Sequence, residues 1–282
     1  MSISKSGSSM AVTKHVVPLS RVSEVRLYPH LTVVFCDMKA HGEKRGKIVV
    51  AIDIGSTKTS AAFSIVLPDG TEFLRHILRF PGADPGRKDS DELPAVAARS
   101  ERGWEFGDFA KASADGVLFT DIKLSITRQL PAAVKKLQAS FDEVYLRWGV
   151  SEDTTDLIKE LFRFILKSVE RRVLEDPECR EALGSRPFEE VTKESRVTCP
   201  VAHSESLRLT LVDAARKAGF ALVDITTEPS AAGTYVVCSG KIPENDANLV
   251  VVDCGGLTCV RRQHSPPPKQ PGPIFLISPP LF

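Results

Sequence analysis

The chain has 282 residues, of which 42% are hydrophobic and 26% are charged, and its formal net charge at pH 7 is +1. This composition is ordinary for a folded globular protein and excludes disorder throughout. The near-zero charge, without basic clusters interleaved with aromatic residues, excludes nucleic acid and anionic membrane surfaces as expected partners.

The six cysteines are scattered, with no C-x-x-C pair and no histidines at zinc-ligand spacing. We therefore expect reduced core thiols in a cytoplasmic protein. No apolar run approaches membrane-spanning length, and the N-terminus lacks a hydrophobic signal segment. The cysteines are Cys36, Cys179, Cys199, Cys238, Cys254 and Cys259.

Residues 1–47 do not resemble part of the domain that follows, and we expect a mobile leader there. Lys14, Arg21 and Arg26 leave an organelle-targeting peptide open as an alternative. An incorrectly assigned start codon explains the segment equally well, and residues 31–36 suit a lone strand.

Residues 48–54 predict a buried strand, because they are rich in β-branched side chains and carry one charge, Asp53. A carboxylate in such a run is expensive to bury, so it indicates a site residue. Gly55 then begins a turn with two hydroxyls and a cation, Ser56, Thr57 and Lys58, that suits phosphate. Strand-forming residues resume at 60–67, so the turn is expected at the tip of a β-hairpin. The alternative is an ordinary hairpin with a polar tip.

A turn at 68–70 and an alternating strand at 71–80 extend the pattern to β-β-β. Residues 81–93 have loop composition, 104–109 suit a short strand, and 118–129 suit a short helix or strand. The clearest helix is 151–174, with apolar residues at the 3.6 period and Ser151, Asp153 and Asp156 as an N-terminal capping region. We expect residues 81–187 to form an inserted α+β subdomain.

The core pattern resumes with a strand at 195–200, a helix at 204–218 that stops at Gly219, and a strand at 220–226. Glu228, followed by Pro-Ser-Ala-Ala, then opens a small-residue helix to about residue 238. A further strand at 248–254 carries Asp253 and precedes Gly255 and Gly256.

Three of these motifs together resemble a known family. D-x-G-[ST]-T at Asp53 resembles the first phosphate motif of the actin-like ATPase superfamily. The strand ending at Pro200, the helix ending A-x-x-A-G-F, the next strand and E-P-S-A-A are similar to the heat-shock-70 ATPase pattern, and Asp253-Cys-Gly-Gly resembles its second phosphate motif. The motif sequences IVVAIDIGST, EPSAA and VVDCGG are most similar to the divergent fungal and A12-type branch of the heat-shock-70 family. This resemblance implies an α/β fold over residues 48–256, an RNase-H-like first lobe with a mixed sheet, followed by the first strand of the second lobe.

The resemblance also implies a site for ATP or ADP with Mg²⁺. Asp53, Glu228 and Asp253 would surround the metal through water, and Lys123, in F-T-D-I-K-L, would orient the attacking water. The alternative for Glu228 is a helix-cap acid, and the alternative for Lys58 is a solvated cation. The phosphate contacts would come from two turns: Gly55, Ser56, Thr57 and Lys58 on one side, and Gly255, Gly256 and Thr258 on the other.

The family pattern breaks after Gly256, where Leu257 stands in place of glycine and Val260 in place of an aspartate. Residues 257–282 are expected to be a proline-rich aberrant tail, from a chain that ended prematurely through a shifted frame or an intron, with the second lobe missing. We therefore expect weak MgATP binding and negligible turnover, because half of the cleft is absent.

Two other functions stay open. D-I-G-S-T-K-T also resembles the opening of sugar kinases of the same superfamily, although their C-x-C-G-x-x-G-C zinc signature is absent. A non-catalytic protein that displays the proline tail to an SH3-type partner is the other alternative. If the chain is chaperone-like, a co-chaperone or client protein is the expected partner.

Overall fold

The computed structural model describes residues 46–81, 89–128, 130–184, 186–201, 203–238, 250–254 and 259–263. Most of the expected leader therefore lies outside the described residues. Lys47, which we had assigned to that leader, instead begins the first strand and places its ammonium 2.7 Å from a carboxylate oxygen of Glu194.

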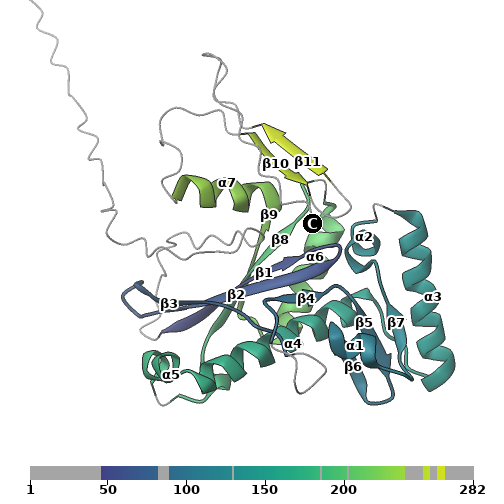
Figure 1. The fold of residues 1–282 in the computed structure, drawn as a ribbon, viewed down its shortest axis with the longest axis horizontal. Helices are drawn as coiled ribbons and strands as arrows, with labels where there is room; N and C mark the ends of the chain where they lie inside the picture. Colours follow the sequence, from purple (N-terminus) through teal and green to yellow (C-terminus); the bar gives the residue numbers. More distant parts are fainter. Residues whose placement is uncertain are drawn as a thin grey trace, which may run out of the picture.

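A mixed sheet forms the centre of the molecule (Figure 1). Its first three strands are antiparallel neighbours, and β1, β8 and β9 are parallel. These strands confirm the predicted β-β-β start and the two later strands. In sheet order they are β3 (Glu72–Ile77), β2 (Lys58–Val66), β1 (Lys47–Ile54), β8 (Lys193–Cys199) and β9 (Leu222–Thr227), with β4 (Glu92–Pro94) paired to β2.

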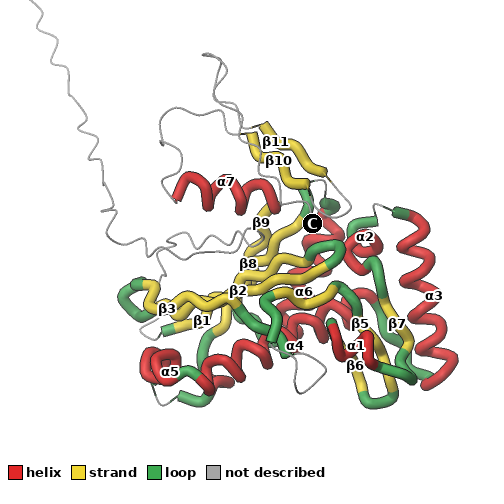
Figure 2. The backbone as a smooth tube through the Cα atoms, in the orientation of Figure 1, coloured by secondary structure: helices red, strands yellow, loops and turns green. Residues whose placement is uncertain are grey.

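Two long helices, α4 (Thr154–Glu175) and α6 (Glu205–Ala218), pack against each other beneath this sheet (Figure 2). The predicted capping region is confirmed, because the Asp153 carboxylate accepts hydrogen bonds from the first turn of α4 in a capping box. Phe162 of α4 meets Phe220, just after α6, edge to face with ring centroids 6.2 Å apart. α4 thus packs against α6, which lies between β8 and β9, and the insertion over residues 81–187 stays a prediction.

A smaller domain-like unit does lie beside the sheet, where we expected the insertion (Figure 1). Its antiparallel sheet has the order β6-β5-β7, and three helices accompany it. The elements are β5 (Ala97–Ser100), β6 (Gly103–Phe106), α1 (Asp108–Ala112), β7 (Val117–Phe119), α2 (Ile122–Ile126) and α3 (Pro131–Trp148).

The helix α3 was not predicted, because its surface is mostly polar. Its start and stop signals were nevertheless present, with Pro131 at the first helical position and Gly149 after the last turn at φ 68°. Its buried residues recur at helical spacing and face the core: Ala133, Leu137, Phe141 and Val144.

The remaining elements lie outside these two sheets. They are α5 (Pro177–Leu183), a 3₁₀ turn at Phe188–Glu190, α7 (Glu228–Cys238), β10 (Val250–Cys254) and β11 (Cys259–Gln263). β10 and β11 pair as an antiparallel hairpin, so the chain is still in a strand within the range we had assigned to the proline-rich tail. Among the described helices, none has the length and apolar character to cross a membrane.

Candidate functional site

The candidate site lies where β1, β8 and β9 end. These strands are parallel, so their carboxyl ends meet at one edge of the sheet, which is where open α/β sheets hold their ligands. Asp53 is the penultimate residue of β1, Cys199 is the last of β8, and Glu228 directly follows β9. The topology therefore brings the first phosphate motif and the E-P-S-A-A motif to the same edge.

Asp53 is held by a neighbour that the sequence did not reveal. It lies opposite Thr198 in the β1–β8 register, and the Thr198 hydroxyl donates a short hydrogen bond to Asp53 Oδ1. A half-buried carboxylate is stabilised by such a donor, and the bond also orients it. Its second oxygen, Oδ2, is the one left for a ligand at the sheet edge.

Lys123 and Glu228, which are far apart in the sequence, form an ion pair. Lys123 Nζ lies 2.6 Å from Glu228 Oε1, and each side chain is only 11% exposed. The proposed catalytic lysine is thus beside the proposed magnesium-site glutamate. Glu228 also begins α7, so its assignment as a helix-cap acid and its assignment as a site residue are compatible.

The short helix α2 positions Lys123 from the smaller unit. It begins after Asp121, whose backbone is left-handed at φ 58°. The Ser125 hydroxyl donates to the carbonyl oxygens of Asp121 and Ala133, at 2.9 Å each, and so fastens α2 to the start of α3. The lysine therefore extends from a rigid segment and reaches the edge of the other sheet.

Cys199, a buried thiol, is close enough to this ion pair to sense both of its charges. The thiol is 1% exposed, and burial, with the nearby Glu228 carboxylate, raises its pKa to about 11 while Lys123 opposes the shift. At neutral pH it is a protonated thiol and not a nucleophile. Sequence analysis identified it only as a core cysteine.

The turn between β1 and β2 confirms the predicted hairpin tip but changes the role of Gly55. Its N–H donates to the Lys58 carbonyl oxygen at 2.9 Å, so this group closes the turn and is not directed at a phosphate. A Cβ at Gly55 would lie 2.3 Å from the same oxygen, so only glycine fits. Ser56 is half-buried and Thr57 is exposed, and both remain candidates for ligand contact.

Lys58 pairs with Glu92 of β4, and its side chain is 54% exposed. Of the two roles considered for Lys58, the solvated cation is therefore the better supported. Asp253 is opposite Val260 in the β10–β11 register. Gly255, Gly256 and Thr258 lie outside the described residues, so only one of the two predicted phosphate turns is placed.

Comparison with known proteins adds no assignment. Neither the scan against protein-family models nor the search of curated proteins found a match for this chain. The geometry of the site and the motifs in the sequence are therefore the basis for assigning a function.

Proposed function

We propose that the chain binds a nucleoside triphosphate with Mg²⁺ at this sheet edge, as the first lobe of a heat-shock-70-like member of the actin-like ATPases. The observation that carries the proposal is the meeting of Asp53, Lys123 and Glu228. Each was singled out by a different motif, and the buried ion pair joins two of them. Glu228 is two strands across the sheet from Asp53 and two residues further along the strand direction. These offsets place the two Cα atoms about 12 Å apart. A water-bridged magnesium site spans such a distance.

The arrangement of the sheet supports the same proposal. Three antiparallel strands followed by two parallel ones, with α6 connecting β8 to β9, are what the resemblance implies for an RNase-H-like lobe. Strand order alone does not determine chemistry, because one fold carries many functions. The side chains at the carboxyl edge are what narrow the proposal to a phosphate ligand.

The donor set suits a hard divalent cation. Asp53 and Glu228 offer carboxylate oxygens, and Mg²⁺ prefers a few such oxygens together with retained water. The cation would offset charge on the β- and γ-phosphates. The fixed Thr198 hydroxyl keeps Asp53 oriented, and Glu228 holds the Lys123 ammonium where it can contact a phosphate oxygen or the attacking water.

Turnover is expected to be slow even if nucleotide binds. Catalysis of phosphoryl transfer needs positioning and electrostatic stabilisation from both sides of the phosphates. The residues placed at the carboxyl edge of β1, β8 and β9 supply one side. We therefore propose nucleotide binding as the activity of this chain, with a co-chaperone or client protein as a proposed partner.

Calorimetric titration of the purified full chain with ATP, with and without Mg²⁺, tests the proposal. Asp53→Asn should weaken MgATP binding by at least about 10-fold, since it removes a charge from the metal site. Glu92→Gln is the matched control, because Glu92 pairs with exposed Lys58 and is not expected to contact the cation. Equal affinity of the wild type and Asp53→Asn would overturn the proposal. Phosphate release above the Asp53→Asn blank, or phosphorylation of a hexose, would identify a competent ATPase or a sugar kinase instead.

A further inference from the structure

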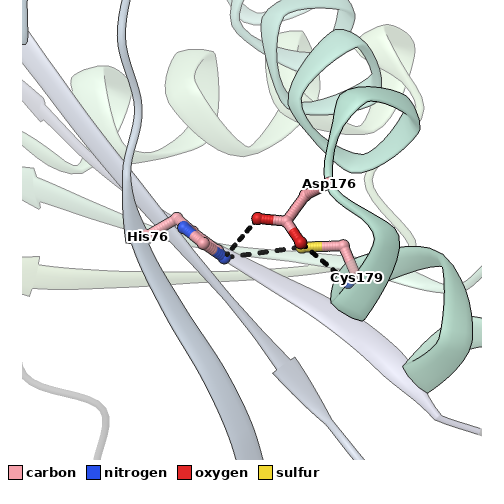
Figure 3. Close-up of side chains that lie close together, drawn as sticks. All are labelled: His76, Asp176 and Cys179. Atoms are coloured by element: carbon pink, nitrogen blue, oxygen red, sulfur yellow. Dashed lines mark hydrogen bonds and ion pairs between the residues drawn. The ribbon is translucent and has the colours of Figure 1, made fainter.

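A second polar cluster lies away from the sheet's carboxyl edge, between the edge strand β3 and α5. His76 comes from β3, Asp176 precedes the first residue of α5, and Cys179 lies in its first turn. Figure 3 shows the three side chains converging across the gap between the strand and the helix. His76 Nε2 is 3.6 Å from Asp176 Oδ2 and 3.5 Å from Cys179 Sγ, and all three ligand atoms lie within 4.8 Å of one another.

The two separations from His76 Nε2 match edges of a tetrahedral zinc site. Zn–N, Zn–O and Zn–S bonds of ordinary length at the tetrahedral angle put nitrogen about 3.6 Å from sulfur and about 3.4 Å from oxygen. A direct hydrogen bond between a histidine N–H and a carboxylate is shorter, near 2.7–2.9 Å. The histidine and the carboxylate are therefore not a directly hydrogen-bonded pair, and their spacing suits two ligands of one ion, while the Cys179 thiol lies within hydrogen-bond distance of the same ring nitrogen.

The same geometry argues against a cysteine–histidine catalytic triad. In a triad the acid and the nucleophile use opposite ring nitrogens of the histidine. Here Asp176 and Cys179 both face Nε2. Cys179 is also fully buried, so a substrate has no access to its sulfur.

Two of the three ligands, Asp176 and His76, are held in place by neighbouring groups. Asp176 Oδ1 accepts hydrogen bonds from the backbone N–H groups of Glu178 and Cys179, which leaves Oδ2 toward the histidine. The ring of Phe63 stacks on that of His76 with centroids 5.2 Å apart. Preorganised ligands with fixed outer partners are what a metal site needs.

The charges around the cluster also suit a divalent ion. A carboxylate and a thiolate together neutralise Zn²⁺, and an imidazole, a carboxylate and a thiolate are all accepted zinc ligands. Arg172 donates to Asp176 Oδ2 at 3.1 Å, but a carboxylate oxygen has room for both an N–H donor and a metal. Arg172 would then act as an outer partner of the bound carboxylate.

We propose that His76, Asp176 and Cys179 form a Zn²⁺ site that fastens the edge strand β3 to α5. On binding, the Cys179 thiol proton leaves to solvent and the thiolate bonds the metal. Water completes the tetrahedron from the side where His76 and Asp176 are partly exposed. The site is separate from the proposed nucleotide site and does not depend on it.

Cobalt titration of the reduced, metal-free full chain tests this proposal, because Co²⁺ bound to a thiolate absorbs strongly in the near ultraviolet and shows tetrahedral bands in the visible. One equivalent of Co²⁺ should give both signals, and Zn²⁺ should displace it. Cys179→Ser and His76→Gln should weaken binding by at least about 100-fold, beyond what loss of an outer partner costs. Asp176→Asn should weaken it by at least about 10-fold while still capping α5, since asparagine caps as well as aspartate.

Cys199→Ser is the matched control, because Cys199 is an equally buried thiol without a histidine contact among the interactions described, and it should leave cobalt binding unchanged. Far-ultraviolet circular dichroism of each metal-free variant checks folding. If His76→Gln or Cys179→Ser fails to fold, the wild-type spectrum and Asp176→Asn still decide. A wild type without the thiolate band, or equal affinity in Cys179→Ser, would overturn the proposal.

Discussion

Two buried cysteines of the described chain lie beside an acid–base pair, and the two pairs differ in how closely they meet. Next to Cys199, the Lys123 ammonium and the Glu228 carboxylate are 2.6 Å apart. Next to Cys179, the imidazole of His76 is 3.6 Å from the carboxylate of Asp176. At the first place the protein supplies its own full positive charge. At the second the Arg172 guanidinium lies 3.1 Å from Asp176 Oδ2, and the wider spacing between the imidazole and that carboxylate leaves room for an external cation.

The two thiols are alike in burial and in the shift of their pKa. Burial raises the pKa of each to about 11, and both are reduced core thiols, as the sequence predicted. The difference in chemistry therefore lies in the neighbours and not in the cysteine. An ion pair built from lysine closes its site, whereas a histidine-based cluster remains open to a metal.

The largest expected effect is on the closed pair. Lys123→Met would leave the Glu228 carboxylate buried without its cation, so the free energy of unfolding should fall by about 3–5 kcal/mol. Lys136→Met, which breaks an ion pair whose lysine side chain is 58% exposed, should cost about 1 kcal/mol or less. Urea unfolding of both variants measures the difference. Similar costs would show that the Lys123–Glu228 pair is not buried.

A double variant distinguishes the effect of the buried charge from that of lysine packing. Adding Glu228→Gln to Lys123→Met also removes the buried carboxylate charge, so most of the lost stability should return. If the double variant is no more stable than Lys123→Met, packing of the lysine stem, and not its charge, holds the two segments together.

The next effect is a pH dependence at the closed site. Because the pKa of Cys199 is about 11 in the folded chain and 9.0 ordinarily, its contribution is present below pH 9 and is lost as the pH rises from 9 to 11. Two pKa units correspond to about 3 kcal/mol at most. Cys199→Ser should therefore show a shallower loss of stability over this range than the wild type in urea unfolding. Identical slopes would contradict the burial argument for this thiol.

The smallest effect concerns the open cluster without metal. Asp176 caps α5, so Asp176→Ala should cost about 1 kcal/mol and Asp176→Asn much less. Ser204→Ala, which removes the cap of α6, is the matched control with a similar cost. Adding Zn²⁺ should distinguish the Asp176 cap from the Ser204 cap. The melting temperature should rise in Ser204→Ala but not in Asp176→Ala, and a rise in both would place the metal elsewhere.

Local signals explain what the sequence predicted well. β1 and α6 are bounded by residues that act within a few positions, such as Gly55 at the turn and Gly219 at φ 116°. Motifs also located Asp53, Lys123 and Glu228, which the structure brings to one edge of the sheet. What stayed hidden was the partner of each, because Thr198 is 145 residues from Asp53 and only the strand register joins them.

The rest could not be predicted because it depends on long-range packing. The location of α4 beneath the main sheet follows from contacts such as Phe162 with Phe220, which no local pattern shows. His76 and Cys179 are 103 residues apart, so no short sequence motif indicates that they meet. Chain proximity predicts α4 within the insertion, whereas its packing against α6 depends on tertiary contacts.

The parallel pairing of β1 with β8 also bears on how the protein is made. Because Asp53 and Thr198 are 145 residues apart, β1 has no β8 beside it until most of the lobe has been synthesised. At ribosomal speeds this interval is about 7–30 s. During that time one edge of the growing hairpin, with Ile48, Val50 and Ile52 in its strand, lacks its neighbour. Because this pairing is long-range, the nascent chain is expected to fold slowly. Until β8 is made, the open edge of β1 can pair with strands of other chains.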